Sequence, residues 1–351
     1  MAAAAHFSLP LDLSPMEARL ASDLPAGGGW QFEPKWDGFR CLAFRAGAAI
    51  ELRAKSGKSL TRYFPEIVAL LRALPAAQFV LDGELVVPRD GTLSFDLLQM
   101  RLHPAESRIR KLAAETPARF ILFDLLADGA AGRWLERPLR MRRQALEAFY
   151  RASGGHAQLR LSPFTLSRAE AQHWLERSGG ALDGVMAKRL DEPYQPGIRA
   201  MLKVKPIRTA DCVVGGFRYG QDTQLVGSLL LGLYDAEGKL DHVGFTSGLR
   251  DADRPALTKR LQKLVDPPGF TGRAPGGPSR WSSGRSAEWL PLKPKLVVEV
   301  EYDQVTDARF RHGTRLVRWR PDKAPRQCTM LQLAPARPPA ALVRAAMGAL
   351  E

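Results

Sequence analysis

Residues 33–40 read Glu-Pro-Lys-Trp-Asp-Gly-Phe-Arg, at the end of a short strand-like run, and the interpretation of the whole chain starts from them. A lysine two residues before an Asp-Gly pair can be held with its amine in a cleft, because Gly38 lets the chain reverse sharply. Alone, Lys-x-Asp-Gly is a weak pattern that chance produces in roughly one chain in ten of this size. A surface lysine beside a hairpin turn explains it equally well. Residues further along the chain decide between the two.

The composition is that of an ordinary folded, basic protein. Of the 351 residues, 45% are hydrophobic and 25% are charged, and 51 Lys and Arg outnumber 37 Asp and Glu to give a net charge of +14. This excludes a wholly disordered, collagen-like or coiled-coil chain, and the length suggests two domains. The charge attracts polyanions, with nucleic acid the leading candidate, although ribosome-associated and membrane-surface proteins share it.

Cysteine usage and the apolar runs indicate the compartment. Cys41, Cys212 and Cys328 lie far apart and in no CxxC pair, so neither a disulfide framework nor a structural zinc site is indicated. The run Ala2–Ala5 has no basic flank, and no 18-residue apolar stretch occurs. We therefore expect a soluble protein of the reducing cytoplasm, associated with the nucleoid and not with a membrane.

The chain changes character near Lys205 and Pro206. Before this point short strand-like runs mix with helical segments, whereas after it strand-like runs predominate, with one amphipathic helical stretch at 251–265. Five strands with one intervening helix suit a small β-barrel such as an OB-fold. We predict an α+β protein with two domains and a C-terminal tail, over residues 1–206, 207–335 and 336–351.

Five further motifs follow the first one in order. They are Leu81–Val86 (LDGELV), Phe120–Asp124 (FILFD), Leu182–Lys188 (LDGVMAK), Met201–Lys205 (MLKVK) and Arg318–Lys323 (RWRPDK). With residues 33–40, the series resembles the nucleotidyltransferase motifs of ATP-dependent DNA ligases and mRNA capping enzymes. The likeness is greatest to the small, two-domain bacterial ATP-dependent DNA ligases, and it spans Trp30 to Lys323.

The resemblance implies an ATP-grasp-like adenylyltransferase domain followed by an OB-fold domain. It implies that Lys35 attacks the α-phosphate of ATP, and that the lysyl-AMP formed is used to seal a nick between a 5′-phosphate and a 3′-hydroxyl. Mg²⁺, with Mn²⁺ as an alternative, would be held by Glu84 and Asp183. The last motif would meet the pyrophosphate through Arg320, Asp322 and Lys323.

The resemblance also assigns contacts to the nucleotide. Glu33 would hydrogen-bond the adenine amine, and Phe123 would stack on the base. Glu84 would lie near the ribose as well as the metal. The remaining contacts are cationic: they are Arg40 and Lys55 at the ribose or the nick phosphate, and Arg199, Lys203 and Lys205 facing the nucleotide and its α-phosphate.

The chemistry of amine attack agrees with this set. An amine must be neutral to attack phosphorus, whereas a free lysine with a pKa near 10.4 is almost wholly protonated at neutral pH. Making it half neutral requires a downward pKa shift of about 3 units, or roughly 4 kcal/mol. Arg40, Lys203, Lys205 and Mg²⁺ are the cations that the motifs would bring near Lys35, and we expect them to supply this shift.

Two positions depart from the usual ligase pattern. Residues 54–57 read Ala-Lys-Ser-Gly where ligases usually have Ser-Arg-x-Gly, so Lys55 stands in place of an arginine and lacks its bidentate fork. Asp183 stands where many ligases carry Glu, and it is still an oxygen ligand suited to Mg²⁺. We expect a weaker contact at Lys55.

Some of these residues also have a purely structural explanation. Phe123 in an apolar strand suits a hydrophobic core, and Lys203 and Lys205 alternate as on a solvated strand face. Seven Lys or Arg occur between Arg309 and Arg326, as a solvated hairpin would allow. The order of the motifs favours the functional interpretation of Phe123, Lys203 and Lys205. We expect the basic tract to bind nucleic acid.

Two other functions stay open at this point. An RNA ligase or a GTP-using capping-type guanylyltransferase would use the same motifs, because sequence does not place the polar atoms that distinguish purines. A non-catalytic nucleic-acid-binding scaffold would keep the fold, but it would be expected to lose Lys35, Glu84 or Lys205, and all three are present. As a DNA ligase, the chain would act as a monomer on nicked double-stranded DNA, with Ku-like or polymerase repair partners.

Overall fold

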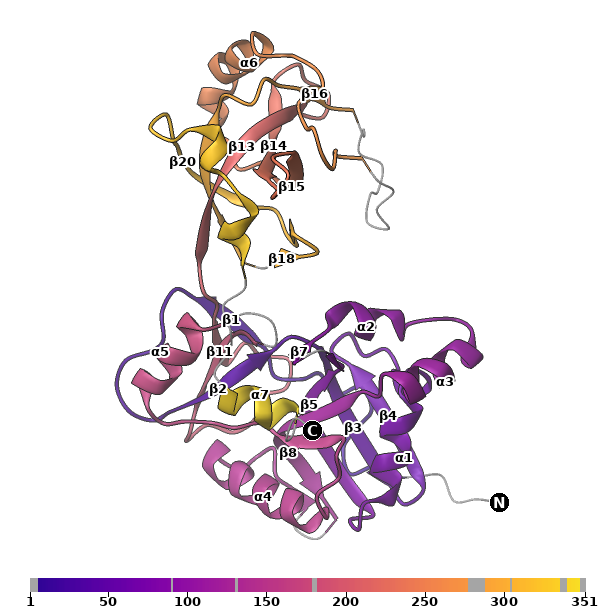
Figure 1. Ribbon diagram of the computed structural model, residues 1–351. Coiled ribbons are helices and arrows are strands. Elements are labelled where there is room, and N and C mark those ends of the chain that lie inside the picture. Colours follow the sequence, from indigo (N-terminus) through magenta and orange to yellow (C-terminus); the bar gives the residue numbers. More distant parts are fainter. Residues whose placement is uncertain are drawn as a thin grey trace. The chain divides into compact units, whose positions relative to one another are not determined.

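The computed structural model describes residues 6–89, 91–129, 132–178, 182–276, 288–303, 305–334 and 340–347. The chain divides into two units: Met1–Pro206 together with Ala336–Glu351 form the first, and Ile207–Pro335 form the second. Figure 1 shows the helices and strands of each unit. Within the described residues, no helix is both long enough and apolar enough to span a membrane.

Two sheets form the first unit. The smaller has the strand order β1-β12-β11-β2, and the larger has the order β10-β8-β5-β3-β4 with β9 added to β8. In these sheets β1 runs parallel to β12 and β10 runs parallel to β8, whereas the other pairs are antiparallel. The strands of this unit, including the β6–β7 hairpin, are β1 (Ala18–Ala21), β2 (Trp30–Trp36), β3 (Phe39–Ala46), β4 (Ala49–Ala54), β5 (Gln78–Val86), β6 (Pro88–Arg89), β7 (Thr92–Leu93), β8 (Arg119–Asp128), β9 (Gly132–Arg133), β10 (Leu159–Leu161), β11 (Leu182–Arg189) and β12 (Met201–Val204).

Helices cover both sheets of the first unit. Helix α4 packs on β8 and α1 on β4, while α5 packs on β11 and β2 of the smaller sheet (Figure 1). Helix α1 begins with Pro65, where a first turn tolerates proline, and the Ser167 hydroxyl caps α5 by accepting from the Glu170 N–H at 3.3 Å. The helices are η1 (Thr61–Tyr63), α1 (Pro65–Ala73), α2 (Phe95–Met100), α3 (Glu106–Glu115), α4 (Leu139–Ala152), α5 (Arg168–Glu176) and α7 (Ala340–Met347).

The larger sheet is buried on both faces, as the nearly continuous apolar run of β8 predicts. Successive residues of a strand point to opposite faces, and here they join different hydrophobic clusters. Phe120 packs with the cluster that includes Leu81, whereas Ile121 packs with the cluster that includes Trp174 of α5. The second of these faces is the one that meets the smaller sheet, and the predicted site lies there.

The expected C-terminal tail is instead part of the first unit. Helix α7 packs on β10, and its Leu342 and Ala346 are buried in the same cluster as Trp174. These two apolar residues are four positions apart and so lie on one face of the helix. That face packs against the first unit, although the sequence alone suggests a free terminal segment. The rest of the expected tail, 336–339 and 348–351, lies outside the described residues.

The second unit is built on an antiparallel sheet with the order β15-β14-β13-β17-β20, to which β16 adds beside β13. Helix α6 packs on β14, and β18 and β19 form a small hairpin. The elements are β13 (Arg208–Tyr219), β14 (Val226–Tyr234), β15 (Leu240–Thr246), η2 (Asp251–Asp253), α6 (Arg254–Gln262), β16 (Leu290–Pro291), β17 (Val297–Tyr302), β18 (Val305–Thr306), β19 (Arg309–Phe310), β20 (Arg315–Trp319), η3 (Pro325–Gln327) and η4 (Met330–Leu333). The five long strands and the helix agree with the sequence, while the closure of a barrel stays a prediction.

Candidate active site

The predicted site residues of the first unit come from both of its sheets. Lys35 and Asp183 lie on β2 and β11 of the smaller sheet, and Glu84 and Phe123 lie on β5 and β8 of the larger one. The sheets meet here, because the ammonium of Lys188 on β11 lies 4.8 Å from the centroid of the Phe123 ring. The site is therefore built where two sheets face each other.

A β-bulge aims Asp183 at Lys35. Where β2 pairs with β11, Lys35 is the single residue opposite two residues, 183 and 184, and bulges of this kind redirect side chains. Gly184 has a φ of +134°, and a Cβ there would lie 2.2 Å from the Val204 carbonyl oxygen, so that only glycine fits. The Asp183 carboxylate contacts the Lys35 ammonium, and the Nζ of Lys205 lies 3.1 Å from the same carboxylate oxygen.

Gly38 of the first motif is needed for a reason other than a sharp reversal. Its φ lies outside the left-handed region, but a Cβ on it would lie 2.3 Å from the Leu85 carbonyl oxygen. Strand β5 passes directly against the start of β3, and this close approach requires glycine. The Asp-Gly pair therefore brings β5, with Glu84, close to the end of β2.

The charge state of Lys35 differs from the expectation. Burial alone would lower the pKa of Lys35, but the Asp183 carboxylate outweighs it by charge and hydrogen bond, and Glu84 and Asp37 act in the same direction. The pKa of Lys35 is therefore raised. The chain's own cations therefore do not produce the expected lowering, because the group nearest to the amine is a carboxylate.

Four lysines nevertheless gather at the site, and we call them the lysine cluster: Lys35, Lys55, Lys203 and Lys205. Lys203 lies on β12 opposite Met186 of β11. Its pKa is lowered, first by burial and then by the charges of Lys35, Lys205 and Lys55. Asp183 pairs with Lys35 and Lys205, and Glu17 pairs with Lys55, so these two carboxylates are shared among three of the four lysines. An anion that brings several negative charges can pair with more of the amines at once, and the cluster therefore suits a polyphosphate.

Glu84 is the second carboxylate near the Lys35 amine. It lies opposite Arg40 in the pairing of β5 with β3. Burial raises the pKa of Glu84 to about 8, although Lys35 and Arg40 act in the other direction. Among the described residues, no three or more His, Cys, Asp or Glu form a metal cluster. Two carboxylates fit Mg²⁺, which keeps water ligands and takes others from substrate phosphates.

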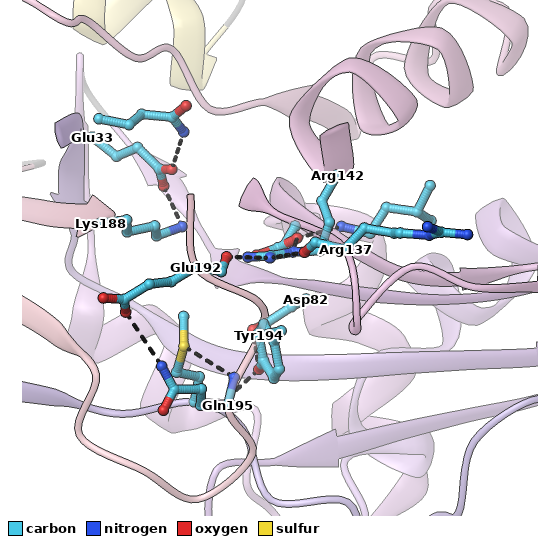
Figure 2. Close-up of polar contacts among 12 residues, drawn as sticks. Glu33, Asp82, Arg137, Arg142, Lys188, Glu192, Tyr194 and Gln195 are labelled. Atoms are coloured by element: carbon cyan, nitrogen blue, oxygen red, sulfur yellow. Dashed lines mark hydrogen bonds and ion pairs between the residues drawn. The ribbon is translucent and has the colours of Figure 1, made fainter. Parts of the chain in front are cut away.

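Arg40 is held by two residues, Asp82 and Tyr194, to which the motif series assigned no role. Its Nε and Nη2 donate to the two carboxylate oxygens of Asp82 at 3.0 and 2.6 Å. The Tyr194 hydroxyl donates to Asp82 at 2.7 Å (Figure 2). Burial would lower the pKa of Arg40, but Asp82 raises it. Asp82 stands in the LDGELV motif and could have been singled out by it, whereas Tyr194 lies in a loop with no motif.

Glu33 and Phe123 form the other end of the site, together with Lys188. The buried Glu33 carboxylate accepts from Lys188 Nζ and from Gln31 Nε2, both at 2.7 Å (Figure 2). The Arg40 guanidinium lies 5.3 Å from the Phe123 ring centroid, so that Phe123 contacts two cations. Lys188 ends the LDGVMAK motif, but sequence reasoning gave it no role.

Lys55 and Arg199 are held differently from the other predicted cations. Lys55 Nζ lies 3.3 Å and Arg199 Nε 3.7 Å from the carboxylate of Glu17, which precedes β1. Both cations are mostly exposed, and Lys55 lowers the pKa of Glu17 more than Arg199 does. Both cations therefore pair with Glu17, and Lys55 also belongs to the lysine cluster through its effect on Lys203.

In the second unit, the last motif is organised around Asp211 of β13. The Asp211 carboxylate accepts from Arg320 Nη1 at 2.9 Å and from Lys323 Nζ at 2.6 Å. Arg320 also donates to Asp322 and, mainly by this hydrogen bond, lowers the pKa of Asp322 to about 2. No motif includes Asp211, so sequence reasoning missed it.

Comparison with known families matches both units. Residues 15–205 match the family described as ATP dependent DNA ligase domain, and residues 222–323 match the ATP dependent DNA ligase C terminal region. The chain belongs to the ATP-dependent DNA ligases. It is therefore a DNA ligase that uses ATP, and DNA is its partner.

Known relatives agree with this family. DNA ligase C2 of Mycolicibacterium smegmatis is 45% identical over 339 residues, which cover 92% of this chain and 94% of the relative. The multifunctional non-homologous end joining protein LigD of Mycobacterium bovis is 34% identical over 84% of this chain and 37% of its own length. A Lig E DNA ligase structure has a TM-score of 0.53 at 17% identity, over 87% of this chain and 99% of that one, and it supports the fold alone.

Proposed function

We propose that the chain seals nicks through an adenylate on Lys35. The observation that carries this proposal is the bulge-directed contact of Asp183 with Lys35, inside a cluster of lysines that suits a polyphosphate. The Lys35 amine attacks the α-phosphate of ATP, a P–N bond forms, and pyrophosphate leaves. AMP then passes to the 5′-phosphate of the nick, and the 3′-hydroxyl displaces AMP to close the strand.

Before the first step the Lys35 ammonium, which is 24% exposed, must release its proton to solvent and lose its contact with Asp183. Asp183 already has a second partner in Lys205, and so it can leave Lys35 without becoming an unpaired buried charge. Lys203 and Lys205 then stabilise negative charge that develops on the α-phosphate and the leaving group. Mg²⁺ held by Glu84 and Asp183 would add positive charge at the same phosphates.

The remaining assignments concern the nucleoside. Arg40, held by Asp82, and Lys55 would contact the ribose or the nick phosphate, and Arg199 would face the nucleotide. Phe123 would stack on the base. Glu33 would meet the adenine amine with its carboxylate, whose two oxygens have room for more than the two donors they now accept.

The second unit would act as an OB-fold that binds DNA and brings Arg320, Asp322 and Lys323 to the pyrophosphate. Strands β15 and β20 lie at the two ends of the sheet order. The Thr314 N–H, directly before β20, donates to the carbonyl of Phe245 on β15 at 3.1 Å, and Thr314 also forms a parallel bridge with Thr246 of β15. These contacts between the two edges support a closed barrel. The Lys205–Pro206 joint would be the hinge between the units.

The cellular role we propose is DNA repair or end joining. The name of the LigD relative, a non-homologous end joining protein, supports this proposal. Nicked double-stranded DNA is the proposed substrate. A monomeric state, a cytoplasmic and nucleoid location, and Ku-like or polymerase partners stay predictions.

Incubation with labelled ATP and Mg²⁺, followed by a denaturing gel, tests the proposal. We expect a covalent labelled band that disappears on addition of pyrophosphate and that unlabelled ATP, but not GTP, suppresses. Addition of nicked duplex DNA should convert the adenylylated protein to unlabelled protein with sealing of the nick, and a nick with RNA on both sides should be sealed less well. Protein that seals DNA without a covalent intermediate would contradict the mechanism.

A further inference from the structure

Asp211 is a partly buried carboxylate that two residues of the last motif share. Arg320 Nη1 donates to one of its oxygens at 2.9 Å, and Lys323 Nζ donates to the other at 2.6 Å. The side chain of Asp211 is 12% exposed, that of Arg320 is 19% exposed and that of Lys323 is 24% exposed. These ion pairs are therefore better shielded from solvent than exposed surface ion pairs, which contribute little to the free energy of folding.

The backbone of Asp211 is fixed as well as its side chain. Its N–H donates to Gln332 Oε1 at 3.0 Å, and Gln332 Nε2 donates back to its carbonyl at 3.1 Å. In the β13–β17 pairing Asp211 lies opposite Glu299, and its neighbours along the strand, Ala210 and Cys212, are buried in the hydrophobic core of this unit. Asp211 is therefore a rigid point to which two long, flexible cations are attached.

Asp322 holds Arg320 from the other side, but without such support. Arg320 Nη2 donates to Asp322 at 2.9 Å, and the Asp322 side chain is 62% exposed. An incoming anion can replace the exposed Asp322 at the guanidinium more easily than it can replace the supported Asp211. The Arg320 fork would then present one edge to the anion while its other nitrogen stays on Asp211.

We propose that Asp211 is a positioning residue for the leaving pyrophosphate, because it holds Arg320 and Lys323 ordered for that anion. This inference rests on the proposed function, since it needs the lysyl-AMP reaction in order to be measured. Lysine and arginine side chains lose much rotamer freedom when an anion recruits them. A carboxylate that orders them beforehand reduces that loss, as outer partners do for metal ligands.

The test uses full-length protein and the reverse of the first step. Purified lysyl-AMP protein is mixed with inorganic pyrophosphate, and ATP formation is followed to give the apparent KM for pyrophosphate. In Asp211→Asn, which keeps the side-chain shape, we expect this KM to rise about 10-fold or more, as for loss of an outer-shell partner. Sealing of nicked DNA that already carries AMP on its 5′-phosphate needs no pyrophosphate, and we expect its rate to stay within about threefold.

Two further variants keep the result interpretable. Asp253→Asn makes the same chemical change at the Arg250 ion pair of the same unit, and the KM for pyrophosphate should not change. Gln332→Leu leaves the charge of Asp211 but removes the hydrogen bonds to its backbone, and it should raise the KM in the same direction by a smaller factor. This variant decides the matter if Asp211→Asn does not fold.

The outcomes separate the two proposals. A wild-type protein that forms no lysyl-AMP contradicts the proposed function itself. A wild type that forms lysyl-AMP, together with variants at Asp211 and Gln332 whose KM for pyrophosphate is unchanged, contradicts only the positioning role. Equal losses in pyrophosphate use and in sealing of pre-adenylylated DNA would mean a structural role, and would also overturn the inference.

Discussion

Asp183 in the first unit and Asp211 in the second are built alike: each is a mostly buried aspartate that holds two cations. Asp183 is 5% exposed and its partners Lys35 and Lys205 are 24% and 21% exposed, which is close to the values at Asp211. The difference lies in what the cations must do. One partner of Asp183 is the proposed nucleophile, which has to leave its carboxylate before it reacts, whereas both partners of Asp211 can act on an anion while they stay paired.

The two centres also differ in how the chain assembles them. Asp183, Lys35 and Lys205 come from β11, β2 and the end of β12, so that the smaller sheet itself creates the centre. Arg320 and Lys323 belong to one short turn after β20 that folds back on Asp211. The ion pairs of Asp183 and Asp211 are alike, so they do not show which centre contains a reacting residue and which contains only positioning residues. Substitutions are needed to separate the two roles.

Lys35→Ala should have the largest effect, because no other group can replace the attacking amine. Intact-mass analysis after incubation with ATP and Mg²⁺ should show an AMP adduct on the wild type and none on the variant. Lys58→Ala, an exposed lysine in the loop after β4, should form the adduct normally. An adduct on another lysine, such as Lys205, would assign the nucleophile elsewhere and erase the contrast between the centres.

Removal of either proposed metal carboxylate should come next in size. Asp183→Ala and Glu84→Ala should each lower nick sealing by about 100-fold or more at saturating Mg²⁺, because each removes a ligand and a transition-state contact. Glu106→Ala, which breaks only an exposed pair on α3, should seal at the wild-type rate. Wild-type sealing by both variants would mean that neither carboxylate holds the metal or contacts the transition state, and would remove the proposed role of Asp183 at Lys35.

The sequence predicts most of the fold and the order of the site. The motif series marks β2, β5, β8, β11 and β12, because each motif contains a strand of alternating or continuous apolar residues beside its polar group. Hydrophobic periodicity likewise predicts the long strands and α6 of the second unit. It does not predict that α7 docks on the first unit, because its short apolar face is equally typical of a free terminal helix.

The bulges are what the sequence cannot show. Asp183 faces Lys35 only because one residue of β2 opposes two of β11, and these strands lie far apart in the chain. Phe123 is likewise the extra residue where the pairing of β5 with β8 shifts register. Register depends on packing over long sequence distances, so no local pattern indicates it. The raised pKa of Lys35 follows from the first of these bulges.

The basic tract of the second unit should have a moderate effect on DNA binding. Arg315 and Arg318 pair with Glu301 and Glu299, but both arginines are well exposed and such pairs give way to a phosphate at little cost. Replacing both by Ala should lower the log–log salt slope of nicked-DNA binding by about 1.8, at 0.9 for each lost phosphate contact.

Two features of this binding test make it specific. Arg250→Ala, an exposed arginine of the same unit outside the tract, should leave the slope unchanged. Point substitutions are preferable to deletion of residues from 208 onward, because that deletion also removes α7 from the first unit. An unchanged slope in the Arg315 and Arg318 double variant would mean that these arginines serve the sheet and not the DNA.

Lys55→Arg should have the smallest effect, because Lys55 is an exposed member of the lysine cluster. Lys55 is 57% exposed and pairs with Glu17 at 3.3 Å, so an arginine has space and keeps that partner. The planar guanidinium of an arginine can contact a phosphate with two nitrogens. The rate of sealing should therefore be unchanged or rise by up to about threefold. Steady-state kinetics on nicked DNA measure this, with Lys58→Arg as the control. A severe loss would mean that the loop after β4 holds its cation more tightly than the Lys55–Glu17 pair suggests, and that this position accepts only a lysine.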